Sequence, residues 1–330
     1  MERPIVAITM GDPAGIGPEI SIKAIINSEV LRNARCLLIG DINILKLARK
    51  YSKIAAVEFR PIKEIAQAKF IRGKIDVLDL QNVPISKYKI GVKSALSGRA
   101  AIEYIEAAIN IAINGKVDAI TTGPINKESI HKAGFKYAGH TEILAKRTKC
   151  KKYAMMFVSE SIWIILVSTH LALARVPTYI TKEKVLNTIK LAQSTLLKVR
   201  GRAPRIAVAG LNPHAGEGGI FGKEDLRIIK PAVDAARKAG INVEGPISPD
   251  AVYYLAKVGM YDIVVSMYHD QGLIPLKLLS FNNSVNVTVG LPIVRTSVDH
   301  GTGFDIAGRG WANPSSLIQA IKVAAHFAKS

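Results

Sequence analysis

Short apolar runs alternate along the chain with longer stretches in which apolar residues recur at helical spacing. The runs have the length of buried strands and lie at residues 5–9, 36–39, 119–122, 162–167, 206–209 and 263–267. The longer stretches, above all residues 97–114 and 181–199, predict amphipathic helices. Strands that alternate with helices are the βαβ pattern, so we expect an α/β fold.

The two clearest helices carry their own boundary signals. We expect Ser97 to cap the first and Gly115 to end it, and Thr181 to cap the second. Each has one apolar face, formed by Ile102, Ile105, Ile109 and Ile113 in the first and by Val185, Ile189, Ala192 and Leu196 in the second.

Composition leaves a globular enzyme as the best class. The 330 residues are 48% hydrophobic, which is enough for one large or two ordinary domains. The formal net charge of +19 raises nucleic-acid binding as an alternative, but the basic residues are spread along the chain and aromatic residues make up only 6%. We therefore expect no nucleic-acid partner, and an anionic substrate accounts for part of the positive charge.

Nothing in the sequence predicts export or membrane insertion. No apolar run approaches the roughly 20 residues that span a bilayer, and the N-terminus lacks the pattern of a signal peptide. The two cysteines, Cys36 and Cys150, have no disulfide framework or zinc-site spacing. We expect a cytoplasmic protein with no membrane partner.

Three of the seven histidines follow the ends of predicted strands. His170, His214 and His269 come a few residues after the runs at 162–167, 206–209 and 263–267. Ligands of open α/β sheets bind beyond the carboxyl ends of the strands, so these side chains are able to converge. Each histidine alone is more often structural, but three imidazoles with open positions describe a catalytic metal site. Asp270, beside His269, is placed to orient the imidazole or to accept a proton.

Two further groups of residues suit an anionic ligand. Residues 139–142 open a predicted helix with His140 and Thr141, which is a ready site for phosphate or carboxylate; an ordinary helix cap is an equally good interpretation. Lys277, Asn286 and Arg295 follow at nine-residue intervals in an apolar stretch, where a cation needs either an anionic substrate or a structural ion-pair partner.

Two glycine-rich segments suggest a nucleotide. The segment at 11–18 lacks the third glycine of the dinucleotide fingerprint and is a weak signal. The segment at 299–310 has small and polar residues that suit a nucleotide resting on backbone.

Six of these motifs together resemble the 4-hydroxythreonine-4-phosphate dehydrogenase family of vitamin B6 biosynthesis. They are ITMGDPAGIGPE at 8–19, TGPINK at 122–127, GHTE at 139–142, GLNPHAGE at 210–217, MYHDQG at 267–272 and RTSVDHGT at 295–302. The resemblance runs nearly from end to end of the chain.

The resemblance implies a role for each matching residue. It makes His170, His214 and His269 metal ligands, and it makes His140, Thr141, Lys277, Asn286 and Arg295 substrate-binding residues. It implies a homodimer with shared active sites, in which one metal ligand, His269, comes from the neighbouring subunit. Across families, the C-terminal loop also looks like the adenosine-binding loop of isopropylmalate dehydrogenases, which implies cofactor binding by His300, Gly301, Thr302, Asp305, Ile306 and Asn313.

The fold implied is a two-domain α/β/α subunit like isocitrate and isopropylmalate dehydrogenases, with the active site in the interdomain cleft. We expect residues 1–124 plus about 280–330 to form the first domain. Residues from about 125 to 279 then form the second, which carries most of the metal and substrate residues.

The implied reaction oxidises 4-phosphohydroxy-L-threonine at C3 with NAD or NADP and one divalent ion (zinc, magnesium or cobalt). Asp250 or Asp270, or a water held by one of them, takes the hydroxyl proton. The β-keto acid then loses carbon dioxide to give 3-amino-2-oxopropyl phosphate. A sister branch that acts on D-threonate or D-erythronate 4-phosphate keeps the same motifs, and a three-histidine metal hydrolase is a more distant alternative.

Overall fold

The computed structural model describes residues 2–54, 57–137, 139–281 and 283–330, and the chain divides into two compact units. The first unit contains residues 1–151 and 291–329, and the second contains residues 152–290. These divisions lie at 151 and 290, whereas the predicted domain boundaries lie near 124 and 280, and the domain assignment stays a prediction.

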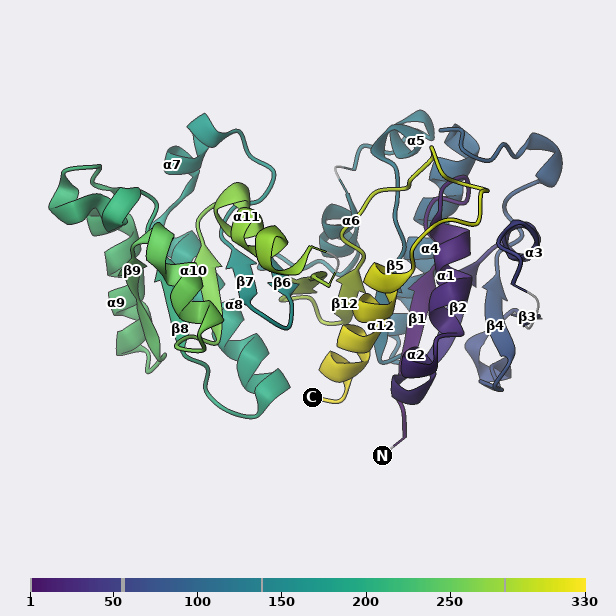
Figure 1. Cartoon of the computed structure of the whole chain (residues 1–330), viewed down its shortest axis with the longest axis horizontal. Coiled ribbons are helices and arrows are strands. Elements are labelled where there is room, and N and C mark those ends of the chain that lie inside the picture. Colours follow the sequence, from purple (N-terminus) through teal and green to yellow (C-terminus); the bar gives the residue numbers. More distant parts are fainter. Residues whose placement is uncertain (1, 55–56, 138, 282) are drawn as a thin grey trace. The chain divides into compact units, whose positions relative to one another are not determined.

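The first unit is built on six parallel strands in the order β3-β4-β2-β1-β5-β12. Their bounds are β1 Ile5–Thr9, β2 Arg35–Gly40, β3 Glu58–Ile62, β4 Lys74–Asp79, β5 Ala119–Thr122 and β12 Val294–Ser297. The helices are α1 Gly17–Ile25, α2 Ser28–Asn33, α3 Ile42–Tyr51, α4 Ala95–Ile113, α5 Lys127–Lys132, α6 His140–Arg147 and α12 Ser315–Ala328. Helices α1 and α12 lie in front of the sheet and α4 lies behind it (Figure 1).

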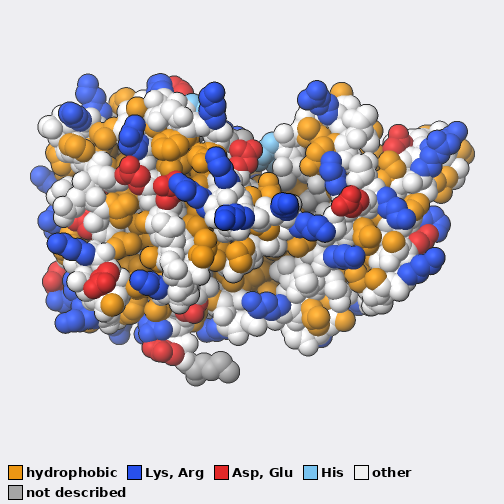
Figure 2. Space-filling view, turned by 180° about the vertical axis from the view of Figure 1, so that it is seen from behind, with side chains coloured by type: hydrophobic (Ala, Val, Ile, Leu, Met, Phe, Trp, Pro, Cys, Tyr) orange, Lys and Arg blue, Asp and Glu red, His pale blue; other side chains and the backbone are white. Residues whose placement is uncertain are grey.

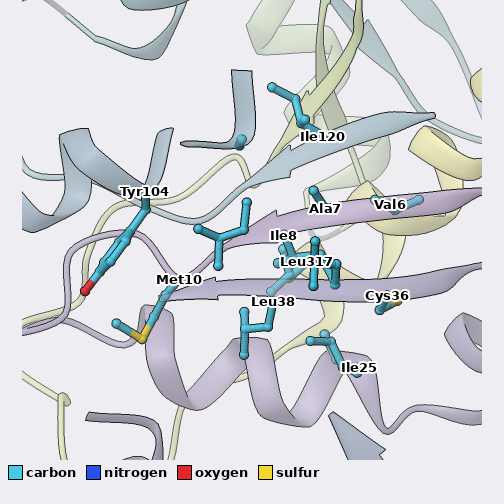
Figure 3. Close-up of a cluster of buried hydrophobic side chains, with 14 of the residues drawn as sticks. Val6, Ala7, Ile8, Met10, Ile25, Cys36, Leu38, Tyr104, Ile120 and Leu317 are labelled. Carbon is cyan, nitrogen blue, oxygen red and sulfur yellow. The ribbon is translucent and has the colours of Figure 1, made fainter. Parts of the chain in front are cut away.

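The core of this unit fills the space between the sheet and its helices. The buried core includes Ile8 of β1, Leu38 of β2, Tyr104 of α4 and Leu317 of α12 (Figure 3). Branched aliphatic residues dominate the strands because both faces of a parallel sheet are covered by helices.

The second unit has a mixed sheet in the order β11-β6-β7-β10-β8-β9. Its strands are β6 Ala154–Val158, β7 Trp163–Leu166, β8 Ile206–Ala209, β9 Val243–Ile247, β10 Ile263–Ser266 and β11 Val285–Val289. Strands β7, β10, β8 and β9 are parallel, whereas β6 is antiparallel to both β7 and β11. The helices are α7 Val176–Tyr179, α8 Lys182–Arg200, α9 Lys230–Lys238, α10 Pro249–Lys257 and α11 His269–Ser280. Helices α10 and α11 lie in front of this sheet and α8 lies behind it (Figure 1).

The predicted strands and helices are present, and so is the expected two-part α/β/α fold class. The prediction for α8 is confirmed in detail, since Thr181 accepts a hydrogen bond from Lys184 N and the four residues predicted to form its apolar face are fully buried.

The predicted cap of α4 is wrong. Ser94, not Ser97, is the N-cap, because the Ser94 hydroxyl accepts a hydrogen bond from Ser97 N and the helix begins one turn earlier. Ile113, predicted to be on the apolar face, is 49% exposed because it is the last residue of the helix and extends past the sheet.

One close approach between helices restricts the sequence of the first unit. A Cβ atom added at Gly98 of α4 would lie 2.0 Å from the carbonyl oxygen of Ser129 in α5. Only glycine allows the two helices to pack at this distance, because the obstructing atom belongs to the backbone.

Replacing Gly98 with alanine is expected to lower the free energy of unfolding by about 1–3 kcal/mol, the cost of overpacking. Urea unfolding measures the change. Gly301→Ala is the control, since a Cβ atom there has no described atom within 4 Å. Equal stability of the two variants would contradict the packing account.

Candidate active site

The three predicted metal-binding histidines follow strands that end at the same edge of one sheet. Strand β10 lies between β7 and β8 and is parallel to both, so the carboxyl ends of the three strands are neighbours (Figure 1). His170 follows β7, His269 follows β10 and His214 follows β8, each within five residues of the strand end. This arrangement comes from pairing of the strands, which the sequence pattern did not specify.

His170 and His269 lie side by side in one chain. Their ring centroids are 5.6 Å apart and their planes are inclined by 40°. His269 Nδ1 lies 2.7 Å from Oδ1 of Asp270, so the carboxylate orients this ring and leaves Nε2 for another partner. Neutral imidazole nitrogens held in this way fit a zinc-type ion as ligands.

His214 lies in a strained loop after β8. Six consecutive residues from 214 to 219 have positive φ, with His214 itself at 50°. Non-glycine residues adopt this left-handed conformation only where surrounding contacts impose it, and such strain is concentrated at functional sites.

Buried Asp225, which sequence reasoning missed, holds this loop in place. Its Oδ1 accepts from Leu211 N at 2.8 Å, and its Oδ2 accepts from the backbone N of Asn212 at 3.1 Å and from the side-chain Nδ2 at 2.9 Å. The spacing of 13 and 14 residues gave no local signal for these contacts.

No group of three or more histidine, cysteine or acidic side chains suited to a metal occurs within the described part of this single chain. The three-histidine metal site therefore stays a prediction. Two of its members are adjacent, and the ring of the third, His214, lies 6.2 Å from that of Phe221.

Asp250, one of the two candidate bases, is in the first turn of α10. The Ser248 hydroxyl donates a 2.5 Å hydrogen bond to its Oδ1, and this bond, helped to a lesser degree by the charge of His214, lowers the pKa of Asp250. Asp250 is thus close enough to His214, a predicted metal ligand, for the two side chains to interact electrostatically, and this position suits a proton acceptor.

In the first unit, Arg295 and His140 lie at the carboxyl end of β5. Arg295 is 2% exposed, and its Nη2 donates to the Thr122 hydroxyl at 2.7 Å. Burial lowers the pKa of Arg295 to about 9. Its charge adds to the effect of burial in lowering the pKa of His140, whose Nε2 lies 3.1 Å from the Gly123 carbonyl oxygen. His140 is therefore neutral at physiological pH, and Arg295 supplies the positive charge.

The remaining predicted substrate residues are on separate elements. Thr141 is in the first turn of α6, where no side chain caps the helix, so the capping interpretation finds no support at Gly139. In the second unit, Lys277 is on α11 with Nζ 5.2 Å from the Phe281 ring centroid, and Asn286 is on β11 opposite Phe157. The nine-residue spacing therefore reflects three different elements.

The two glycine-rich segments are packed against each other in the first unit. Ile16 N donates to the Thr302 carbonyl at 2.9 Å, and a Cβ atom at Gly15 would lie 2.5 Å from the same oxygen. His300, Gly301 and Asp305 stay exposed on the second segment, and Asn313 Oδ1 accepts from Ser315 N at the start of α12. The exposed face and the open space beside Gly301 fit a nucleotide that rests on backbone.

Asp12 is a buried acid that sequence reasoning did not identify. Its side chain is inaccessible to solvent, and burial raises its pKa to about 6, despite the opposing hydrogen bond from Ala14 N. Asp12 N donates to the Pro124 carbonyl, so the residue lies beside the chain segment that contacts His140.

The positive charge is not concentrated in one patch on the face that Figure 2 shows. Lys and Arg side chains are scattered over the face in Figure 2, with Asp and Glu among them. Many are also paired: Asp262 alone binds Arg200 and Arg202, both at 2.6 Å. No helix within the described ranges is both long and apolar enough to cross a membrane.

A two-unit α/β fold with strand-end histidines, a buried arginine and two glycine-rich segments fits the class of dehydrogenases. Comparison with known proteins narrows the class. Residues 32–324 match the model of the family described as pyridoxal phosphate biosynthetic protein PdxA, and the chain belongs to this family.

The alignments with similar proteins extend over almost the whole chain. The chain is 45% identical over 324 residues to a D-threonate 4-phosphate dehydrogenase of Pectobacterium atrosepticum, covering 98% of this chain and 99% of the relative. A crystal structure of 4-hydroxythreonine-4-phosphate dehydrogenase from Klebsiella pneumoniae matches with a TM-score of 0.91 and 43% identity, covering 98% and 99% of the two chains. The chain is thus a dehydrogenase-type oxidoreductase that acts on a CH–OH group, and the family resemblance found in the sequence is confirmed.

The wider kinship in fold is also confirmed. A β-decarboxylating dehydrogenase of Thermococcus kodakarensis matches with a TM-score of 0.50 at 16% identity, covering 98% of this chain and 81% of that one. At this identity the likeness concerns the fold alone.

Asp12→Asn is expected to make the protein more stable at neutral pH. Because the folded-state pKa of about 6 lies above the ordinary 3.8, the folded protein binds the extra proton between these values. The free energy of unfolding therefore falls as pH rises through this window, on the order of 3 kcal/mol in total. Urea unfolding of wild type and variant from pH 4 to pH 8 measures the difference, with exposed Asp305→Asn as control. A difference in unfolding free energy between wild type and Asp12→Asn that does not grow with pH would contradict the raised pKa of Asp12.

Proposed function

We propose that this enzyme oxidises the C3 hydroxyl of a four-carbon acid phosphorylated at C4, with NAD or NADP and one divalent metal ion. The observation that carries the proposal is that His170, His269 and His214 follow three neighbouring parallel strands, with Asp270 orienting the His269 ring. The family supplies the reaction type.

We propose D-threonate 4-phosphate as the preferred substrate and 4-phosphohydroxy-L-threonine as the second candidate. The first preference is supported by the name of the Pectobacterium relative, at 45% identity over the full chain. The second is supported by the names of a Desulforapulum autotrophicum relative, also 45% identical over 324 residues, and of the Klebsiella enzyme, at 43% identity. With the second substrate, the product after decarboxylation is 3-amino-2-oxopropyl phosphate.

The chain's own residues divide the chemical work. Arg295 and neutral His140 in the first unit, and Lys277 and Asn286 in the second, each bind polar or anionic groups of the substrate. Asp250, in the first turn of α10, is the proposed acceptor of the hydroxyl proton, directly or through a water molecule, with Asp270 as the alternative base.

When bound, a divalent ion would lower the pKa of the substrate hydroxyl and a nicotinamide would accept the hydride, chemistry that the side chains do not supply. His170, His214 and His269 are the proposed metal ligands. Their nitrogen donors favour zinc, although cobalt and magnesium are compatible with open sites of this type. We place this chemistry in the cytoplasm, where nicotinamide nucleotides are abundant.

Paired assays test the substrate. NADH or NADPH formation is measured with D-threonate 4-phosphate and with 4-phosphohydroxy-L-threonine, and we expect kcat/KM to be at least about tenfold higher for the first, a difference of about 1.4 kcal/mol. The reverse preference would move the enzyme to the biosynthetic reaction. Absence of turnover and of nucleotide binding with both would favour the metal hydrolase alternative.

The same assay, combined with metal analysis, tests the histidine site. His214→Ala is expected to lower bound metal and turnover by more than about tenfold, as the loss of one ligand does. His131→Ala, an exposed histidine on α5, is the matched control. Full metal content and a normal rate in His214→Ala would overturn the metal assignment.

We also propose that the enzyme is a homodimer with shared active sites. Helix α11, which begins at His269, exposes Ile274, Leu278 and Phe281 by 68%, 85% and 71%, at spacings of four and three residues that align them on one face. Leu173 near His170 and Ile220 near His214 are 68% and 76% exposed. Apolar surface gathered beside all three histidines supports burial against a second copy.

Leu278→Glu is expected to convert the dimer to a monomer, because a carboxylate on this face would be buried without a partner. Sedimentation measures the mass, and metal analysis is expected to show loss of the ion together with the dimer. Ile113→Glu, at an exposed apolar residue of α4, is the control. A stable dimer of Leu278→Glu with full metal content would contradict the proposed interface.

A further inference from the structure

Helix α1 carries an ion pair that reaches across the first unit to the C-terminal glycine-rich loop. Lys23 Nζ lies 2.6 Å from Oε1 of Glu19, one turn earlier on the same helix. Glu19 is fully buried and Lys23 is 22% exposed. A buried carboxylate requires a partner of opposite charge, and Lys23 is that partner.

The pair binds the loop through backbone groups. Lys23 Nζ donates to the carbonyl oxygens of Gly310 and Ala312, each at 2.9 Å, and Glu19 Oε1 accepts from Ala312 N at 2.9 Å. The three ammonium protons of Lys23 thus have three acceptors, counting Glu19. Because every contact is to main-chain atoms of the loop, the pair fixes the path of the loop and not one of its side chains.

The loop needs such support. Residues 300–314 contain no helix or strand, and Gly303, Gly308 and Gly310 have φ of 52°, 82° and 75°. A glycine-rich segment has high conformational entropy when it is not held, so an ordered shape must be imposed by contacts. The beginning of the loop is held by the bond from Ile16 N to the Thr302 carbonyl, and the end is held by the Glu19–Lys23 pair.

We propose that Glu19 and Lys23 are positioning residues for nicotinamide nucleotide binding, which set the shape of the loop before the nucleotide arrives. The inference rests on the proposed function, because it takes the 300–313 loop as the nucleotide site. Pre-ordering lowers the entropy cost of binding, so loss of the pair weakens nucleotide binding without touching the reacting groups.

Loss of the pair is therefore expected to change the kinetic constants for the nucleotide and not those for the phosphorylated acid. Lys23→Met, which keeps the length of the side chain and removes the ammonium group, raises KM for the nucleotide about tenfold and leaves kcat and KM for the phosphorylated acid within about twofold. A loss of general stability would instead change all kinetic constants or the amount of active enzyme.

Proteolysis gives a second readout, independent of activity. Arg309 is exposed, and the next residue, Gly310, is held by Lys23, so trypsin cleavage after Arg309 reports opening of the loop. Mass spectrometry is expected to show faster cleavage there in Lys23→Met than in wild type, and NAD or NADP is expected to slow it in both.

The matched control is Lys322→Met. Lys322 of α12 forms a 2.5 Å pair with Glu29 of α2 in the same unit, away from the loop. Its loss is expected to leave nucleotide KM and cleavage after Arg309 unchanged. If Lys23→Met does not fold, Glu19→Gln, which keeps an acceptor for Lys23 and Ala312 N, is expected to show the same two effects in weaker form.

Unchanged nucleotide KM in folded Lys23→Met, or unchanged cleavage after Arg309, would overturn the positioning role. Failure of the proposed function appears differently: wild-type enzyme would then neither oxidise a phosphorylated acid nor be protected by nucleotide. Cleavage after Arg309 in the absence of nucleotide would still report whether the pair holds the loop.

Discussion

Parallel pairing of β7, β10 and β8 is the constraint on which the site depends. Parallel strands end at one edge of a sheet, so residues that follow them are brought together whatever their separation in the sequence. His170, His269 and His214 follow three such neighbours, and the buried apolar strands between the helices keep these ends in register. The placement of the three histidines at one edge of the sheet is therefore a consequence of strand order.

Buried charge is the second theme of this molecule. Asp225 holds the His214 loop, Arg295 is beside Thr122, and Glu19 with Lys23 holds the C-terminal loop. Each charged group is costly to bury, and each ties loop backbone or a strand-end hydroxyl to the sheet-and-helix core. Loops that carry function are thus made rigid by a few polar contacts to a scaffold of regular elements.

The sequence pattern was sufficient for the regular elements because each has a local cause. Alternating apolar runs and helical spacing predicted the strands and α8, including its cap at Thr181. The cap of α4 was misplaced because Ser94 and Ser97 are both suitable residues three positions apart, and only the hydrogen bond to Ser97 N distinguishes them.

Candidate residues could be predicted where a motif lies beside a strand end. Contacts between residues that are distant in the sequence could not. The histidines could be named from the sequence, whereas Asp12, Asp225 and the contacts of Glu19 and Lys23 with the C-terminal loop could not. Lys23 and Gly310 are 287 residues apart, and no local pattern relates them. The order of the strands in the sheet could not be predicted for the same reason, since it depends on the packing of elements that are distant in the chain.

The central claim is that His170, His214 and His269 serve one metal ion in a site completed by two subunits. The adjacent rings of His170 and His269 within one chain are compatible with this arrangement and also with a site contained in one chain. Subunit complementation separates the two. Inactive His170→Ala and His269→Ala chains are unfolded together and refolded as a mixture, and turnover is compared with wild type. Shared sites predict recovery of about one quarter of the wild-type rate, because half of the dimers are hybrids and each hybrid regains one intact site. No recovery from well-folded hybrid dimers would contradict the account.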